Sequence, residues 1–176
     1  MLDIDKVLFK QSKEAYGKDY ATHCLEIYKL YVEMADRISS RRHSANSFFL
    51  TINSAIIAVL GYVQFGVYLG AKLGVEASQT NEFYGIISVL GMFLCLVWFR
   101  LIQSYKQLNT AKFQVILQIE QFLPIAPFDA EWKVVGKGSE PKLFKPFTDL
   151  EMIIPWVFFV LNFAVFLKVT FSLFIS

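Results

Sequence analysis

The chain has 176 residues, of which 55% are hydrophobic and only 18% charged, and its mean hydropathy is +0.45. Soluble domains carry about 25% charged residues, so this composition favours a single membrane domain. The net charge of +2 is too small to predict nucleic-acid binding. Two distant cysteines, Cys24 and Cys95, do not indicate a disulfide framework.

The first 44 residues contain a mixed-charge arm, for which a short helix or a loose segment is expected, and then an amphipathic helix. We expect no cleavable signal peptide, because the arm lacks an apolar core. Apolar residues recur along the helix at spacings of three and four, which predicts a packing stripe. This stripe fits either a helix of the same chain or a neighbouring subunit. Its members are Tyr20, Cys24, Ile27, Tyr31, Met34 or Ala35, and Ile38.

Residues 45–69 form an almost entirely apolar run without a charged side chain. About 20 apolar residues cross the roughly 30 Å hydrocarbon core, so this run predicts a transmembrane helix. No proline or glycine separates it from the amphipathic helix. We therefore expect one continuous helix from about residue 18 to about residue 68.

A second apolar run predicts a second span over residues 83–102, which continues as a helix until Pro124 stops it. The continuation again carries an apolar stripe, so the two extensions should meet as an antiparallel pair. The stripe consists of Leu101, Tyr105, Leu108, Val115, Ile119 and Phe122.

Residues 124–149 hold four of the five prolines, and strand-like runs at 132–135 and 142–144 predict a small loop or hairpin module. A third span with an apolar tail follows. The fold class expected is an all-α membrane protein with three transmembrane helices, the first two extended into the cytoplasm as an antiparallel pair. The segments are 1–17 arm, 18–44 amphipathic helix, 45–69 first span, 70–82 periplasmic loop, 83–102 second span, 103–123 cytoplasmic helix, 124–149 module, and 150–176 third span and tail.

The positive charges predict the topology. Residues 1–44 and 100–149 carry fifteen of the seventeen lysines and arginines. Positive residues stay in the cytoplasm, so the N-terminus should lie inside and the C-terminus outside. The charges that flank the spans are Arg37, Arg41, Arg42 and Arg100.

Small and amide side chains mark the spans. Small residues let helix backbones approach closely in lipid, and a buried amide needs a partner. These residues either hold helices together, which we favour, or line a polar path. The candidates are Asn46, Ser47, Thr51, Asn53, Ser54, Gln64 and Asn162.

Residues for enzyme chemistry are missing. The two histidines lack metal-ligand spacing, the spans hold no paired carboxylates, and the glycines around Lys137 lack the phosphate-loop spacing. We expect no enzymatic activity, no metal and no cofactor.

Three stretches carry a resemblance to a known family: residues 28–61, 104–132 and 142–158, with the patterns RxxANSFFLTxN and QLNTAKF…LPxAPFDAEW most specific. They resemble the RipA family of small bacterial inner-membrane proteins, whose family name describes them as octameric. The chain is also loosely similar to the two-span SLATT-type membrane effectors. The resemblance implies an oligomeric ring in the bacterial inner membrane and supplies no catalytic residues.

Three functions compete. The first is a homo-oligomeric ring, of eight subunits, around a pore or a lipid-filled opening. The second is a membrane-anchored scaffold that recruits a soluble cytoplasmic partner. The third is a membrane-disrupting effector, which predicts toxicity on overexpression. The surface expected for a soluble partner comprises Trp132, Lys133, Lys137 and Lys142.

Overall fold

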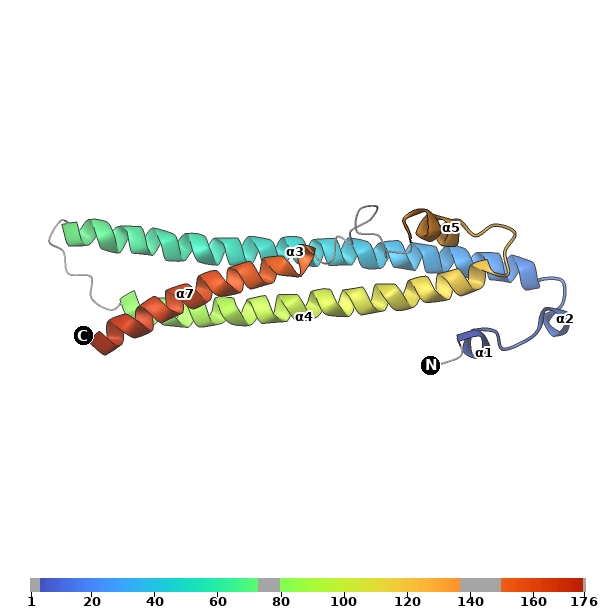
Figure 1. Cartoon of the computed structure of the whole chain (residues 1–176), viewed down its shortest axis with the longest axis horizontal. Coiled ribbons are helices and arrows are strands. Elements are labelled where there is room, and N and C mark those ends of the chain that lie inside the picture. Colours follow the sequence, from blue (N-terminus) through green and yellow to red (C-terminus); the bar gives the residue numbers. More distant parts are fainter. Residues whose placement is uncertain (1–3, 73–79, 137–149, 176) are drawn as a thin grey trace. The chain divides into compact units, whose positions relative to one another are not determined.

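The computed structural model describes residues 4–72, 80–136 and 150–175, and all regular structure in these ranges is helical (Figure 1). The all-helical prediction is therefore confirmed for this part of the chain. The helices are α1 (Ile4–Leu8), α2 (Lys13–Tyr16), α3 (Tyr20–Lys72), α4 (Thr80–Glu120), α5 (Pro127–Val134) and α7 (Ile153–Ile175).

Helices α3 and α4 are each continuous, as the sequence predicts. Helix α3 has 53 residues and α4 has 41, so each joins an apolar span to its amphipathic extension without a break. Both run farther into the expected 70–82 loop than predicted, and the rest of that loop lies outside the described residues. Helix α4 ends at Glu120, before Pro124, which cannot continue a helix.

The chain divides into two compact units. The helical-pair unit comprises Met1–Arg42 and Ser104–Phe147, and the three-helix unit comprises His43–Gln103 and Thr148–Ser176. Both divisions fall within two residues of the ends that the sequence predicts for the first two spans.

The three-helix unit is built from the apolar parts of α3, α4 and α7. One cluster contains Phe49, Trp98 and Ile102, and the rings of Phe49 and Trp98 stack with centroids 5.8 Å apart. A second cluster contains Leu60, Tyr84 and Val169. Since later residues of α3 contact earlier residues of α4, these two helices are antiparallel. Helix α7 supplies one wall of each cluster.

The helical-pair unit packs the amphipathic parts of α3 and α4 against each other. Ala35 and Ile38 of α3 and Ile116 and Ile119 of α4 are buried. The ammonium group of Lys112 lies 5.0 Å from the centre of the Tyr31 ring, so this lysine, between Leu108 and Val115 of the predicted stripe, takes part in the packing.

The predicted stripes are partly wrong. On α3, Ile27 is exposed and Tyr28 is half-buried in its place, and of the two alternatives Met34 and Ala35 it is Ala35 that is buried. On α4, Leu108 and Phe122 are exposed, while Ile102 and Ile116 are buried. The other predicted members, among them Tyr31, Ile38 and Ile119, are buried or half-buried, so the spacing and phase of both stripes are mostly confirmed.

Residues 132–134 are helical, which contradicts the strand predicted there. They complete α5, in which Lys133 donates to the Asp129 carboxylate at 2.6 Å one turn earlier. Alanine and glutamate before Trp132 favour a helix, and they outweigh the preference of two valines for a strand. The partner run at 142–144 lies outside the described residues.

The arm forms two short helices. The Ser12 hydroxyl accepts a hydrogen bond from the Ala15 amide and caps α2, and Gly17 ends it with φ of 93°, a conformation that favours glycine. Phe9 contacts the Phe122 ring, with centroids 4.3 Å apart. The side chains of Asp5 and Gln118 are also hydrogen-bonded. The arm is thus attached to the end of α4.

Candidate functional site

Two buried amides lie inside the three-helix unit. Asn53 of α3 and Asn162 of α7 are both 0% exposed. Each amide nitrogen donates to the carbonyl four residues earlier on its own helix, at 2.8 Å. The Cys95 thiol donates to the Asn53 side-chain oxygen at 3.2 Å, which connects α4 to α3.

Gly91 allows Asn162 to approach α4 closely. A Cβ atom added at Gly91 would lie 2.6 Å from Cγ and 2.8 Å from Nδ2 of Asn162, closer than two such atoms pack. One turn earlier on α4, Ser88 is fully buried and its hydroxyl donates to the Tyr84 carbonyl. Helices α4 and α7 therefore meet through small residues and one amide, as expected for helices packed in lipid.

Asn46 is the third amide that contacts another helix, since its oxygen accepts a hydrogen bond from the Trp98 indole at 2.9 Å. Of the predicted interface or pore-lining residues, Asn46 and Asn53 thus accept hydrogen bonds from another helix of the same chain, and Asn162 packs against Gly91 of α4. This arrangement supports the interpretation that they hold helices together.

Three other predicted candidates, Ser47, Thr51 and Ser54, lie on an exposed face of α3. Ala58 and Gly61 lie on the same face, and we call these five residues the small-residue face. The Thr51 hydroxyl donates to the Ser47 carbonyl at 2.8 Å, so it is satisfied within its own helix. Nothing lies within 4 Å of a Cβ added at Gly61. Gln64, one turn beyond, is exposed as well.

Large apolar side chains dominate the outer faces of α4 and α7, and on α3 they lie beside the small-residue face, as Phe48 and Tyr62 do. Ile86 and Phe93 of α4, and Val160 and Phe171 of α7, are at least 60% exposed. Bulky apolar side chains suit contact with lipid tails. Small side chains leave space for another helix.

The flanking arginines lie where their charges reach solvent. Arg37 forms an ion pair with Glu33 at 2.6 Å, and both side chains are more than half exposed. Such a pair contributes little to stability. Arg41 and Arg100 are exposed and Arg42 is half-buried.

Sequence analysis missed a buried carboxylate in the helical-pair unit. Glu120 is 2% exposed and accepts hydrogen bonds from the Tyr28 hydroxyl at 2.8 Å and from the amides of Phe128 and Asp129 at 3.0 Å. Burial and the hydrogen bond to Glu120 raise the pKa of Tyr28 to about 12. An acidic residue beside the buried Ile116 and Ile119 was the signal in the sequence.

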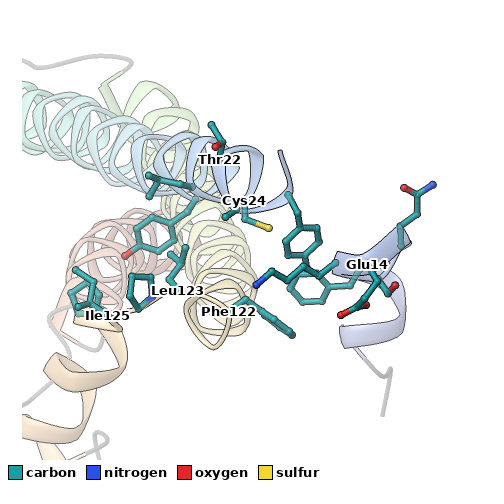
Figure 2. A pocket seen from close by; sticks show the side chains of 16 residues that line it. Glu14, Thr22, Cys24, Phe122, Leu123 and Ile125 are labelled. Carbon is teal, nitrogen blue, oxygen red and sulfur yellow. The ribbon is translucent and has the colours of Figure 1, made fainter. Parts of the chain in front are cut away.

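An open pocket of about 860 Å³ lies in the helical-pair unit (Figure 2). Figure 2 shows Glu14 from the arm, Thr22 and Cys24 from the start of α3, and Phe122, Leu123 and Ile125 after α4. Most of the lining is apolar, and its polar side chains come largely from the arm.

The predicted partner surface is described only in part. Trp132 is 42% exposed, and Lys133 is exposed while paired with Asp129. Lys137 and Lys142 lie outside the described residues. Within the described ranges, no three His, Cys, Asp or Glu side chains gather to hold a metal. His23 hydrogen-bonds the Tyr16 hydroxyl at 2.7 Å.

These features define a class of protein. Helices α3, α4 and α7 are each long and apolar enough to cross a membrane. The chain is therefore an all-helical membrane protein with three apolar helices.

A family comparison makes the assignment specific. The model of the octameric membrane protein family (8xMP) matches residues 25–171, which is most of the chain. The chain belongs to this family. No curated protein and no solved structure matches the chain. The match begins after Cys24, so the arm and much of its side of the pocket precede the matched residues.

Proposed function

We propose that the protein forms a homo-octameric ring in the bacterial inner membrane, in which the small-residue face of α3 contacts the neighbouring subunit. The family description and the resemblance to RipA proteins support the assembly and its location. The exposure of Ser47, Thr51, Ser54, Ala58 and Gly61 is the observation that carries the choice of face.

Each outer face of the three-helix unit is covered either by lipid or by another helix. Lipid tails are as apolar as leucine, so bulky apolar faces gain nothing by leaving lipid. A small-residue face gains close backbone contacts when a helix packs on it. The exposed Gln64 amide would gain a hydrogen-bond partner from a neighbouring subunit. This matters because an amide without a partner in hydrocarbon costs several kcal/mol. A closed ring requires this face to meet a different face of the next subunit.

The opening of such a ring holds water or lipid and has no catalytic function. Highly selective ion filters use rings of carbonyls or charges, and residues 45–69 contain no charged side chain. Since Asn53 and Asn162 are fully buried inside the subunit, a pore would be lined by other, exposed residues. Any conduction would be controlled by an apolar constriction.

A pair of alanine substitutions tests the proposed face. Ala58→Leu fills the small-residue face, while Ala164→Leu makes the same change on the exposed side of α7. Overpacking costs about 1–3 kcal/mol at each interface. Size-exclusion chromatography with light scattering should show smaller species for Ala58→Leu and wild-type size for Ala164→Leu. Equal assembly of both variants would place the interface elsewhere.

The scaffold function is the alternative, and the exposed apolar end of α5 favours it. Trp132 is 42% and Val134 79% exposed, and exposed tryptophans anchor many protein interfaces. A pull-down with the wild-type protein should then recover one soluble protein that a pull-down with Trp132→Ala does not. If the two pull-downs were identical, and deletion of residues 124–149 also changed nothing, the scaffold function would be wrong.

A further inference from the structure

Helix α5 begins without a cap of its own. Its N-cap residue is Ala126, whose side chain cannot accept a hydrogen bond. Pro127, the first helical residue, has no backbone N–H to satisfy. The next two amides, those of Phe128 and Asp129, therefore need acceptors from elsewhere.

Glu120 supplies both acceptors. Its Oε1 atom accepts from the Phe128 amide and its Oε2 atom from the Asp129 amide, each at 3.0 Å. The Ala130 amide makes the first bond within the helix, to the Ala126 carbonyl. One carboxylate from the end of α4 thus completes the first turn of α5, and its negative charge lies at the positive end of the helix dipole.

The same carboxylate ties α5 to α3. The Tyr28 hydroxyl donates to Glu120 Oε1 at 2.8 Å. The Phe128 ring lies against the rings of Tyr28 and Phe113, with centroids 6.5 and 5.6 Å away. These contacts belong to the first turn of α5, whereas the later residues Trp132 and Val134 are exposed. No residue of α5 is fully buried.

We propose that Glu120 is a latch: α5 is held on the α3–α4 pair by this carboxylate, and it can leave the pair without unfolding it. An element with few buried contacts is the kind that opens locally, at a free energy below that of global unfolding. Because α5 carries Trp132, the latch also positions the partner surface of the scaffold alternative. The proposal does not depend on the ring.

Hydrogen exchange of the full-length protein in detergent micelles tests the latch. Glu120→Gln keeps the shape of the side chain but turns one acceptor into a donor that faces an amide. Amides of residues 128–134 should exchange about tenfold or more faster, since their docked state loses its main polar contacts. Amides of the α3 and α4 parts of the helical-pair unit should keep wild-type rates. Glu131→Gln, an exposed carboxylate on α5 itself, is the matched control and should change nothing.

A second variant distinguishes a carboxylate that holds α5 on the α3–α4 pair from one that only caps the N-terminus of α5. In Glu120→Ala combined with Ala126→Asp, the new aspartate satisfies the first amides but does not reach α3 or α4. An eight-residue helix is unstable alone, so exchange should stay fast if Glu120 is a latch. Full recovery of slow exchange would reduce Glu120 to a cap and overturn the proposal. So would wild-type exchange of α5 in Glu120→Gln, or equal acceleration throughout α3 and α4.

Discussion

At Gly91, α4 and α7 lie too close together to leave space for a Cβ atom. Gly91→Ala places a methyl group against the Asn162 side chain, which is buried and bonded to the Phe158 carbonyl. We expect a loss of about 1–3 kcal/mol of stability, the usual cost of overpacking. Thermal unfolding in detergent, followed by circular dichroism, measures this loss.

Gly85→Ala on the same helix is the control. Its new methyl group would lie 3.8 Å from Val169, an ordinary contact, so stability should not fall. Asn162→Ala should remove most of the Gly91→Ala penalty in a double mutant. Equal stability of Gly91→Ala and wild type would contradict the close packing.

The Tyr28 hydroxyl should stay protonated to a higher pH than the hydroxyl of an ordinary tyrosine. Its pKa is about 12 in the folded protein against 10 for an ordinary tyrosine, because of burial and then the Glu120 hydrogen bond. The folded pKa is raised, so the contribution of the neutral hydroxyl to stability is complete below about pH 10 and is lost as the pH rises through about 12. A difference titration at 295 nm between wild type and Tyr28→Phe measures the pKa. A transition near pH 10 would contradict the buried hydrogen bond.

Residue roles were only partly predictable from the sequence. The amides at 46, 53 and 162 stood out, because polar residues in apolar runs need partners. Glu120 was missed, because its partners are backbone amides eight and nine residues later and a hydroxyl of another helix. A pattern of side-chain types does not show backbone donors.

At the scale of elements, the continuity of α3 and α4 was predictable and the short helix α5 was not. The runs through α3 and α4 contain no proline, and 3.6-residue periodicity is strong over such lengths. Helix α5 has eight residues, too few to show periodicity, and its first turn depends on a carboxylate outside it. Tertiary contacts decided its structure.

The register of α3 against α4 can be tested with one new cysteine. Asn53 and Cys95 are in contact at 3.2 Å, so Asn53→Cys should form a disulfide with the native Cys95 on mild oxidation. A protease site introduced between the first two spans would then leave two fragments joined until reduction. Ser54→Cys, one residue farther on the exposed face, should not crosslink within the subunit. Equal crosslinking in both variants would contradict the register.

For the whole molecule, the distribution of charge predicts the orientation in the membrane. Fifteen of seventeen positive residues lie before the first span or between the end of the second span, at Arg100, and the third. Green fluorescent protein fused to the N-terminus should fluoresce, and alkaline phosphatase fused to the C-terminus should be active outside. Fluorescence of a fusion to the C-terminus would show that this end lies in the cytoplasm, which would contradict the prediction.

The central claim is that eight copies of this chain form one closed assembly. The family description and the uncovered small-residue face of α3 lead to it. Native mass spectrometry of the detergent-extracted protein tests it most directly, because it weighs the assembly against a 20.2 kDa subunit. We expect a dominant species of eight subunits. A monomer or dimer as the largest species would contradict the ring and leave the anchored scaffold as the better account.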